Sequence, residues 1–462
     1  MKTYQDYLEI AEKSEQERIS FIQGVINEHK TSKLYRDAVV AQQYYKRHNV
    51  TIEQYQKLLY TMTGKAVPDN YSANWKMKHG FFHLFTTQEV QHLLGNGVTW
   101  KNDATQGKLG ENIDTQVMKA AKAAIIGAVS FGFYNLDHVD VFEVTEFAPL
   151  YDEEDGALKA GVRFWQIDTN KPLRATFFEL DGYTDYIWRN SKGESKGEVL
   201  NEKRPYILKL RESTADGTEI YDYKNYPSFP IVPMWANDEH QSGLDGLREQ
   251  IDCYDLIKSG FANDIDDASL IYWTIQNAGG MDDVDLAKFV ERMHTVKAAV
   301  VDADGATAEA HTMDVPSESR ERLLDRLKDD LYTDAMALDL KNISGGATTA
   351  TQIIASYKPL DSKCDELEYC VLEWLDGILA LAGIEDEKPT FTRDYIVNKS
   401  EEIQTLVQGA QYLTEDYITE KIMTILGDGD QAEAIIKQRI ADDLAVDYDN
   451  TEEEEQQTVV QE

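Results

Sequence analysis

Two stretches in the middle of the chain repeat apolar side chains at helical spacing. The first runs from Ser242 to Ile265 in steps of three and four, which predicts one amphipathic helix of about 22 residues. The second begins at Pro316, with Ser317 as the expected cap, and continues through Leu338. The stripe residues are Leu244, Leu247, Ile251, Tyr254, Lys258, Phe261 and Ile265 in the first helix and Leu323, Leu324, Leu327, Leu331 and Leu338 in the second. Stripes this narrow predict that both helices pack against partners.

The acidic side chains of the first helix fall mostly outside its apolar stripe. Asp245, Glu249, Asp252 and Asp255 are therefore expected to face water or a like-charged cavity. Two glycines weaken the first turn of this helix.

A short insert, residues 269–314, separates the two stripes. Its predicted elements are a strand over Leu270–Ile275, a short helix over Met281–Thr295, a strand over Lys297–Val301, and a hairpin turn at Asp304-Gly305 leading into Ala308–Met313. A segment of about 45 residues makes a small core, so we expect the insert to complete its packing with a neighbour.

The chain before these helices, residues 1–240, divides into three parts by its hydrophobic periodicity and composition. Residues 1–130 show helical periodicity, residues 131–226 are short aromatic and β-branched runs separated by turns, and residues 227–240 form a proline-rich connector. This order predicts a helical part, an antiparallel β region and a stiff link into the first long helix.

Two helices of the N-terminal part are predicted over Ile52–Met62, with Thr51 as the cap, and over Asn74–Leu94. The second would put His79 and His83 four apart on one face, a spacing that can ligate metal. Aromatic side chains surround both histidines, which favours packing over metal binding.

Beyond the second stripe the sequence divides into four segments of different composition and periodicity. Residues 339–351 are small and polar, residues 352–383 predict a long helix kinked at Pro359, residues 384–446 predict further helices, and residues 447–462 are acidic and expected to be disordered.

Composition sets the outer bounds. The 462 residues are 42% hydrophobic, enough for two or three cores, and no apolar run reaches the ~18 residues that cross a bilayer. The N-terminus lacks the apolar core of a secretory signal, and Cys253, Cys364 and Cys370 show neither disulfide nor zinc spacing. We therefore expect a non-membrane protein of a reducing cytoplasm.

The formal net charge of −37 disfavours tight, sequence-independent binding of nucleic acid by the bulk surface, because phosphates are neutralised by clustered Lys and Arg. One interpretation is an ordinary solvated acidic surface. The other is an acidic wall past which DNA slides, because the wall repels phosphates at close range. The two interpretations are compatible.

The sequence offers no catalytic motif. Gly345-Gly346 lacks the lysine of a phosphate-binding loop, no G-x-S-x-G is present, and no cysteine has a histidine at a recognisable spacing. Carboxylate pairs are expected by chance among 83 acidic residues. We expect no enzyme, no cofactor and no metal; an acidic hydrolase or nuclease of unknown specificity is the alternative to a structural subunit.

Several features occur together in a fixed order. They are the Tyr44-Tyr45 helix end; Asn74 through Trp100, with Phe81-Phe82 and Leu93-Leu94-Gly95; the Ser242-Gly243-Leu244 start and its helix through Asn263-Asp264; the strand, helix and hairpin of the insert; and Ile343-Ser344-Gly345-Gly346-Ala347 followed by Tyr357-Lys358-Pro359-Leu360. Over roughly residues 35–385 this order resembles the portal proteins of tailed bacteriophages, in the branch with a compact subunit.

The resemblance implies an α+β, mainly α-helical subunit. Its implied parts are a wing over 1–240, stem helices over 241–268 and 315–338, a small α/β clip over 269–314, a tunnel loop over 339–351, a long kinked helix over 352–383 joining wing and crown, a helical crown over 384–446 and the acidic tail.

The resemblance also implies a structural role in a ring, commonly of twelve copies, at one vertex of the phage head. The ring would be the channel for DNA packaging and ejection, assembled in the host cytoplasm and retained in the virion. The implied partners are other copies of this chain, the terminase large subunit, a head-completion or adaptor protein, the major capsid and scaffolding proteins, and double-stranded DNA passing without sequence specificity.

Seven residues of the implied tunnel loop are expected to face the channel. They are Lys341, Asn342, Ser344, Gly345, Gly346, Thr348 and Thr349. The glycines supply backbone freedom, the hydroxyls exchange hydrogen bonds with phosphates, and the lysine adds a modest attraction. The alternative is an ordinary surface loop between helices.

Overall fold

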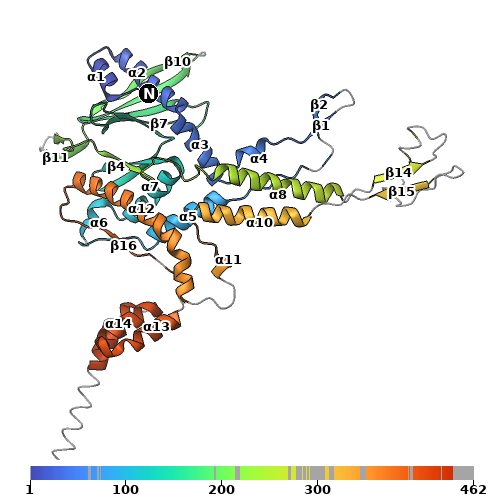
Figure 1. The fold of residues 1–462 in the computed structure, drawn as a ribbon. Coiled ribbons are helices and arrows are strands. Elements are labelled where there is room, and N and C mark those ends of the chain that lie inside the picture. Colours follow the sequence, from blue (N-terminus) through green and yellow to red (C-terminus); the bar gives the residue numbers. More distant parts are fainter. Residues whose placement is uncertain are drawn as a thin grey trace, which may run out of the picture. The chain divides into compact units, whose positions relative to one another are not determined.

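The computed structural model describes most of the chain (Figure 1). The described residues are 2–60, 64–69, 72, 74–102, 104–191, 194–213, 219–268, 272–276, 284, 288, 291, 307–311, 317–343, 350–393, 395, 399–427 and 429–440. The chain divides into two compact units, Met1–Ala337 with Ser362–Arg393 and Leu338–Asp361 with Asp394–Glu462. Both helices and antiparallel sheets are present, which confirms the predicted α+β fold class.

Helices make up much of the first unit. They are α1 (Tyr4–Ala11), α2 (Glu15–Thr31), α3 (Lys33–Tyr45), α4 (Val50–Gln54), α5 (Phe81–Leu94), α6 (Ala104–Leu109), α7 (Ile113–Gly127), α8 (Arg248–Ala268), α10 (Ser317–Asp334) and the later part of α12 (Ala350–Ala382). Local chemistry sets the start of α1, because Thr3 and Asp6 each accept a hydrogen bond from the other's backbone N–H in a capping box.

Strands follow the early helices. They are β1 (Leu58–Tyr60), β2 (Ala66–Pro68), β3 (Val98–Thr99), β4 (Val129–Asn135), β5 (His138–Glu143), β6 (Phe147–Tyr151), β7 (Leu158–Trp165), β8 (Leu173–Glu179), β9 (Gly182–Ser191), β10 (Glu194–Arg204), β11 (Ile207–Ser213), β12 (Glu219–Lys224), β13 (Ile231–Trp235), β14 (Tyr272–Gln276), β15 (Thr307–His311) and β16 (Thr390–Phe391). This confirms the predicted β region after residue 130.

A five-stranded antiparallel sheet in the order β10-β9-β8-β7-β6 forms one core with the N-terminal helices. The apolar face of α2 packs on this sheet, and the buried cluster that results includes Ile22, Ile26, Val162, Phe177 and Trp188. Alternating side chains of the strands supply one side of this core and the helix stripe supplies the other.

A three-stranded antiparallel sheet, in the order β13-β4-β5, lies against α7, and Trp374 of α12 contacts it as well. Gly132 on β4 faces the Trp374 ring of α12, and a Cβ there would come within 2.3 Å of that ring. The indole N–H of Trp374 donates to the carbonyl of Val232 on β13 at 3.2 Å. The glycine is therefore required for the helix to approach the sheet.

The structure differs from several predicted boundaries. Where a helix is predicted over Ile52–Met62, the structure has the short α4 followed by strand β1. Helix α5 begins only at Phe81, so His79 lies outside it and the prediction that His79 and His83 share a helical face is wrong. The sequence does not predict β1 and β2, because they are short and lie among helices, or β13, because prolines surround it. These strands form by pairing with partners elsewhere in the fold.

The first long helix begins at Arg248 rather than at Ser242. Residues 243–247 form turns, and Gly246 has a φ of 80°, a left-handed conformation that cannot continue a right-handed helix. The second long helix is described over Ser317–Asp334, so it ends at Asp334 rather than at the predicted Leu338, and Met336 beyond it has a φ of 53°, a left-handed conformation.

Of the insert, the structure describes mainly its first and last strands. β14 and β15 pair antiparallel, with Tyr272 opposite His311 and Gln276 opposite Thr307. The strand predicted over Lys297–Val301 and the turn at Asp304-Gly305 lie outside the described residues, as does most of the predicted helix over Met281–Thr295.

The regular elements described in the second unit are all helical. It contains α11 (Leu340–Ile343), the first part of α12, α13 (Lys399–Gln408), α14 (Glu415–Leu426), two short 3₁₀ turns, Ala410–Tyr412 and Gly429–Gln431, and helical residues 432–440. The predicted long helix over 352–383 is confirmed as α12, with Pro359 inside it. The predicted disordered tail, 447–462, lies outside the described residues.

Candidate functional site: the root of the α8 and α10 hairpin

Helices α8 and α10 form an antiparallel hairpin that projects from the body of the first unit (Figure 1). Near the start of α8 the Gln250 amide donates to Asp334 at 2.5 Å, and near its end the Asp264 carboxylate contacts the Arg320 guanidinium at 2.5 Å. These two contacts fix the register of the two helices along their length.

The predicted stripe residues are buried at the root of this hairpin and less so farther out. The buried ones are Leu244, Leu247, Ile251 and Tyr254 before and on α8 and Leu324 and Leu331 on α10; Phe261, Lys258 and Leu327 are half-buried, and Ile265 and Leu323 are exposed. Tyr254 meets Phe81 of α5 edge-to-face, with ring centroids 5.1 Å apart. One chain therefore buries the root of the stripe and leaves part of its outer half uncovered. Leu338 is buried within the second unit.

The segment just before α8 is tied to the end of α7. The Ser242 hydroxyl donates to the Ile126 carbonyl at 2.8 Å, and the Gly243 N–H donates to the Ile125 carbonyl at 2.8 Å. A Cβ at Gly243 would lie 2.9 Å from the Ile125 side chain. A glycine at this position lets the hairpin root approach the body closely.

The acidic residues of α8 are not all solvated, and the prediction that Asp255 faces water or a like-charged cavity is wrong. Asp255 is fully buried and accepts hydrogen bonds from the Asn49 amide at 2.5 Å, the His79 backbone N–H at 3.1 Å and the His79 ring N–H at 2.7 Å. A buried carboxylate is tolerated when such donors replace its water.

Asp252, one turn earlier, is tied to the N-terminal helices. It accepts from the Tyr44 hydroxyl at 2.5 Å and from the Thr51 hydroxyl at 2.6 Å. Burial and the hydrogen bond to Asp252 raise the pKa of Tyr44 above its ordinary value. Asp252 and Asp255 thus join α8 to residues about 200 positions earlier.

Two further polar residues continue this seam toward the outer half of α8. Ser259 accepts from the Met77 N–H at 2.9 Å, and Asn263 accepts from the Trp75 N–H at 2.6 Å. The segment 74–80, which has no regular secondary structure, is therefore held along α8 by side chains at helical spacing. Helical periodicity alone does not reveal this seam; its one signal in the sequence is the recurrence of short polar residues beside the apolar stripe.

Lys363 anchors α12 at the hairpin root. Its ammonium group lies 2.8 Å from a carboxylate oxygen of Glu89 on α5 and donates to the Ala335 carbonyl after α10 at 3.3 Å. Burial raises the pKa of Glu89, and the neighbouring Lys363 opposes that rise. Three helices therefore meet at one cation.

The predicted channel-facing residues are described only in part. Lys341 and Asn342 lie in the single helical turn of α11 rather than in a loop. Ser344, Gly345, Gly346, Thr348 and Thr349 lie outside the described residues.

Within the described ranges, no group of three or more His, Cys, Asp or Glu side chains could hold a metal ion. No helix among those same residues is both long enough and apolar enough to span a membrane. The chemical role of this site is structural: its hydrogen bonds and apolar contacts fix a projecting helical hairpin on a folded body.

Comparison with known proteins extends the resemblance found in the sequence. The family model described as "Phage portal protein, SPP1 Gp6-like" matches residues 25–443. The portal protein of Bacillus phage SPP1 is 25% identical over 426 residues, covering 84% of this chain and 80% of that relative. The portal protein of Clostridium phage phiCD119 is 30% identical over 186 residues, 38% of this chain and 41% of that relative. The family match begins within α2 and spans the five-stranded and three-stranded sheets, the α8 and α10 hairpin and the helices beyond it, so this chain belongs to the SPP1-type phage portal protein family.

Proposed function

We propose that this chain assembles into a closed ring at one vertex of the phage head, with twelve copies the number expected from the resemblance, and that DNA enters and leaves through it. The family is a structural, non-enzymatic one whose members belong to the virion capsid. The ring, the channel and the partners below are our proposals for this chain.

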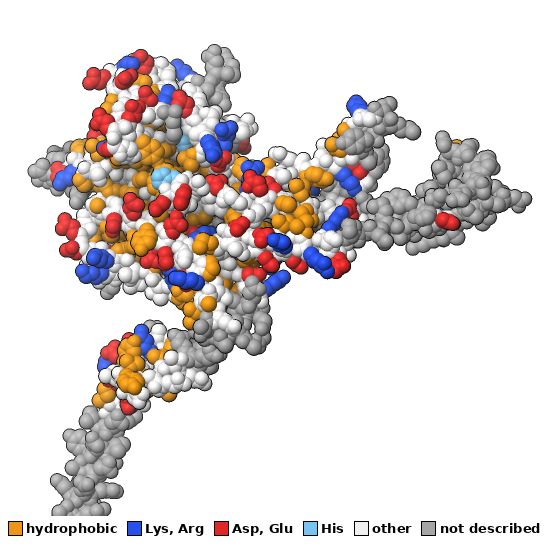
Figure 2. All heavy atoms as spheres, viewed as in Figure 1, with side chains coloured by type: hydrophobic (Ala, Val, Ile, Leu, Met, Phe, Trp, Pro, Cys, Tyr) orange, Lys and Arg blue, Asp and Glu red, His pale blue; other side chains and the backbone are white. Residues whose placement is uncertain are grey.

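Uncovered apolar surface in a single chain is the observation that carries the proposal. Helix α14 has no buried residue, and large apolar side chains of the second unit stay exposed: Val407, Tyr412, Leu413, Tyr417 and Leu426. Leu323 and Ile265 on the hairpin are exposed as well, and Figure 2 shows apolar side chains gathered over this hairpin on the face in view. Exposed apolar side chains that gather on one face, as they do over this hairpin, are typical of association sites.

In the proposed ring, α8 and α10 are stem helices and residues 269–314 are the clip. The body over residues 1–240 is the wing, residues 352–383 join it to the crown, and residues 384–446 are the crown. The short strand β16, which pairs with β3, connects residues 390–391 to the first unit and so narrows the proposed crown to the residues after Arg393.

We assign residues 339–351 to the channel wall, with Lys341, Asn342, Ser344, Gly345, Gly346, Thr348 and Thr349 nearest to DNA. Contact with a moving duplex has to be weak, because DNA carries one charge per ~1.7 Å of its axis. Hydroxyls and a single cation per copy suit that requirement.

Docking is assigned to the clip. The terminase large subunit and later a head-completion or adaptor protein would bind residues 269–314, and capsid and scaffolding proteins would surround the wing. The paired strands β14 and β15, at the outer end of the hairpin, give this insert a defined base.

The mass of the native assembly tests the central proposal. The chain has a mass of 52.5 kDa, and we expect micromolar protein to give a single multiple of that mass and a ring with a central hole in electron micrographs. A monodisperse 52.5 kDa species under the same conditions would contradict the ring and its channel.

A further inference from the structure

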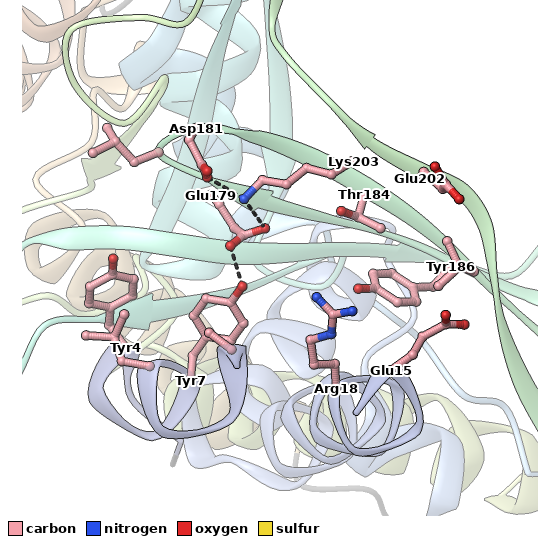
Figure 3. Close-up of a pocket in the computed structure, with 14 residues that line it drawn as sticks. Tyr4, Tyr7, Glu15, Arg18, Glu179, Asp181, Thr184, Tyr186, Glu202 and Lys203 are labelled. Carbon is pink, nitrogen blue, oxygen red and sulfur yellow. Dashed lines mark hydrogen bonds and ion pairs between the residues drawn. The ribbon is translucent and has the colours of Figure 1, made fainter. Parts of the chain in front are cut away.

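A cleft of about 700 Å³ lies between the N-terminal helices and the five-stranded sheet (Figure 3). Helices α1 and α2 form one wall, and the ends of β8, β9 and β10 form the other. Tyr4, Tyr7 and Tyr186 line it, and Leu8 and Leu180 stand beside it with 51% and 49% of their surface exposed. Aromatic walls with exposed leucines are typical of protein docking sites.

The cleft is acidic. Four carboxylates line it, those of Glu15, Glu179, Asp181 and Glu202, against the cations Arg18 and Lys203. Lys203 is paired with Glu179 at 3.1 Å and with Asp181 at 2.5 Å, and the Tyr7 hydroxyl donates to Glu179. The exposed Glu202 has no such partner recorded among the described residues. A guest with apolar and cationic side chains suits this lining.

The turn between β7 and β8, residues 166–172, presents such side chains. Ile167 at its tip is 87% exposed, and Trp165 two positions earlier is also exposed. Lys171 and Arg174 flank them, both exposed, and no ion pair of either is recorded within the described part of the chain.

Hydrogen bonds hold this turn rigid. The Gln166 amide donates to the carbonyls of Thr169 and Lys171 at 3.3 and 2.8 Å. An oxygen of Asp168 accepts from the Asn170 N–H and the Thr169 hydroxyl, both at 3.1 Å, so this carboxylate is used inside the turn. A rigid turn loses little entropy on docking, so an exposed isoleucine at its tip is a suitable anchor.

The turn and the cleft lie at opposite ends of the same strand. β8 starts at Leu173, directly after the turn, and ends at Glu179, which lines the cleft. Seven residues of strand separate the two surfaces by about 20 Å, so one chain cannot place its own turn in its own cleft. Two different, complementary surfaces facing opposite ways generate a head-to-tail contact, which closes into a ring when the rotation between copies allows.

We propose that the 166–172 turn of one copy docks in the cleft between α1, α2 and the sheet of the next copy. Ile167 and Trp165 would meet Tyr4, Leu8 and Leu180, because Tyr7 and Tyr186 are buried at the floor of the cleft, and Lys171 would approach Glu202. This proposal rests on the ring proposed above and names one contact that joins its wings.

Cysteine cross-linking tests the contact on the full chain. In a Cys253→Ser background, the pair Ile167→Cys and Leu8→Cys should form disulfides only between copies, because a disulfide requires Cα atoms within about 7 Å. Oxidation should give a ladder of covalent oligomers on a denaturing gel. The matched control pairs Ile167→Cys with Tyr369→Cys, an exposed position on α12 outside the cleft, and should give no ladder.

Charge exchange gives a second readout. Lys171→Glu should weaken assembly about tenfold, and adding Glu202→Lys should restore it to within about twofold, because the exchanged charges attract again. Rings that form normally but give no ladder and no rescue would overturn this contact and leave the ring standing. An unsubstituted chain that remains monomeric would overturn the ring and the contact together.

Discussion

The polar residues of α8 show how a single buried side chain can decide where a helix sits. Asp255 is fully buried and takes hydrogen bonds from Asn49 and His79, two residues that flank the segment leading to α5. Removing the carboxylate would leave these donors without an acceptor, and unsatisfied buried groups are costly. The hairpin root therefore depends on one acid as well as on its apolar stripe.

Asp255→Ala should lower the free energy of unfolding by about 3 kcal/mol, because it leaves the donors of Asn49 and His79 buried and unpaired. Urea unfolding followed by tryptophan fluorescence measures the change. Glu249→Ala is the matched control, since it removes an exposed carboxylate from the same helix and should change stability little. Equal stability of the two variants would mean that the Asp255 network does not support the hairpin.

No local pattern in the sequence reveals Asp255. Helical periodicity separates apolar from polar positions, and it assigns a polar residue to water unless a partner is known. The partners of Asp255 lie about 200 residues earlier, so their approach is a property of the tertiary fold. The apolar stripe itself needs no such knowledge, because its spacing is local.

At the scale of elements, long periodic helices could be predicted and short strands could not. The presence of α10 and the span of α12 follow from helical repeats over many residues, although α10 ends at Asp334, before the predicted Leu338. The antiparallel strands after residue 130 follow from alternating runs between glycine turns. The sequence does not predict β13, because it carries Pro233, yet β13 pairs with β4 at the edge of its sheet, with Pro233 opposite Phe131. The predicted start of α8 is wrong because a glycine can adopt either helical or left-handed backbone, and the sequence does not show which of the two Gly246 adopts.

Helix α12 is unusual in having a proline, Pro359, in its interior. A proline has no N–H to donate to the carbonyl four residues earlier, here that of Ala355, so this 33-residue helix lacks one bond in its interior. The residues on its C-terminal side are held by Lys363 and by Arg393, which contacts Asp365 at 2.7 Å. The helix is thus locally weakened next to a firmly anchored segment.

Pro359→Ala should restore the missing hydrogen bond and stabilise α12 locally by up to about 3 kcal/mol. Amide hydrogen exchange of residues 355–361 should then slow by tenfold or more, while exchange in α7 stays unchanged. Lys358→Ala, an exposed neighbour that keeps the proline, serves as the control. Unchanged exchange in the Pro359→Ala protein would show that the helix is not weakened at this point.

At the scale of the whole molecule, charge is the property that bears most directly on a DNA channel. Each copy carries a formal charge of −37, and Figure 2 shows Asp and Glu side chains spread over the face in view. Within about 10 Å at 0.1 M salt, such a surface repels a duplex rather than holding it. A conduit benefits from this, since a wall that bound phosphates tightly would slow the passage of DNA.

Purified rings should therefore fail to retain a duplex of about 30 base pairs in a gel-shift assay, with any dissociation constant weaker than the ~10⁻⁴ M typical of non-specific binding at physiological salt. The same absence of binding should hold at about 0.05 M salt, where a protein with clustered cations gains several orders of magnitude in affinity. Lys341→Ala rings are the matched comparison, because they lack the cation assigned to the channel wall and should behave identically in this bulk assay. A shift at low salt that fades steeply as salt rises would show that cations cluster on the assembled surface. DNA would then bind to these clustered cations, and the explanation that an acidic wall repels DNA would fail even if the ring itself forms.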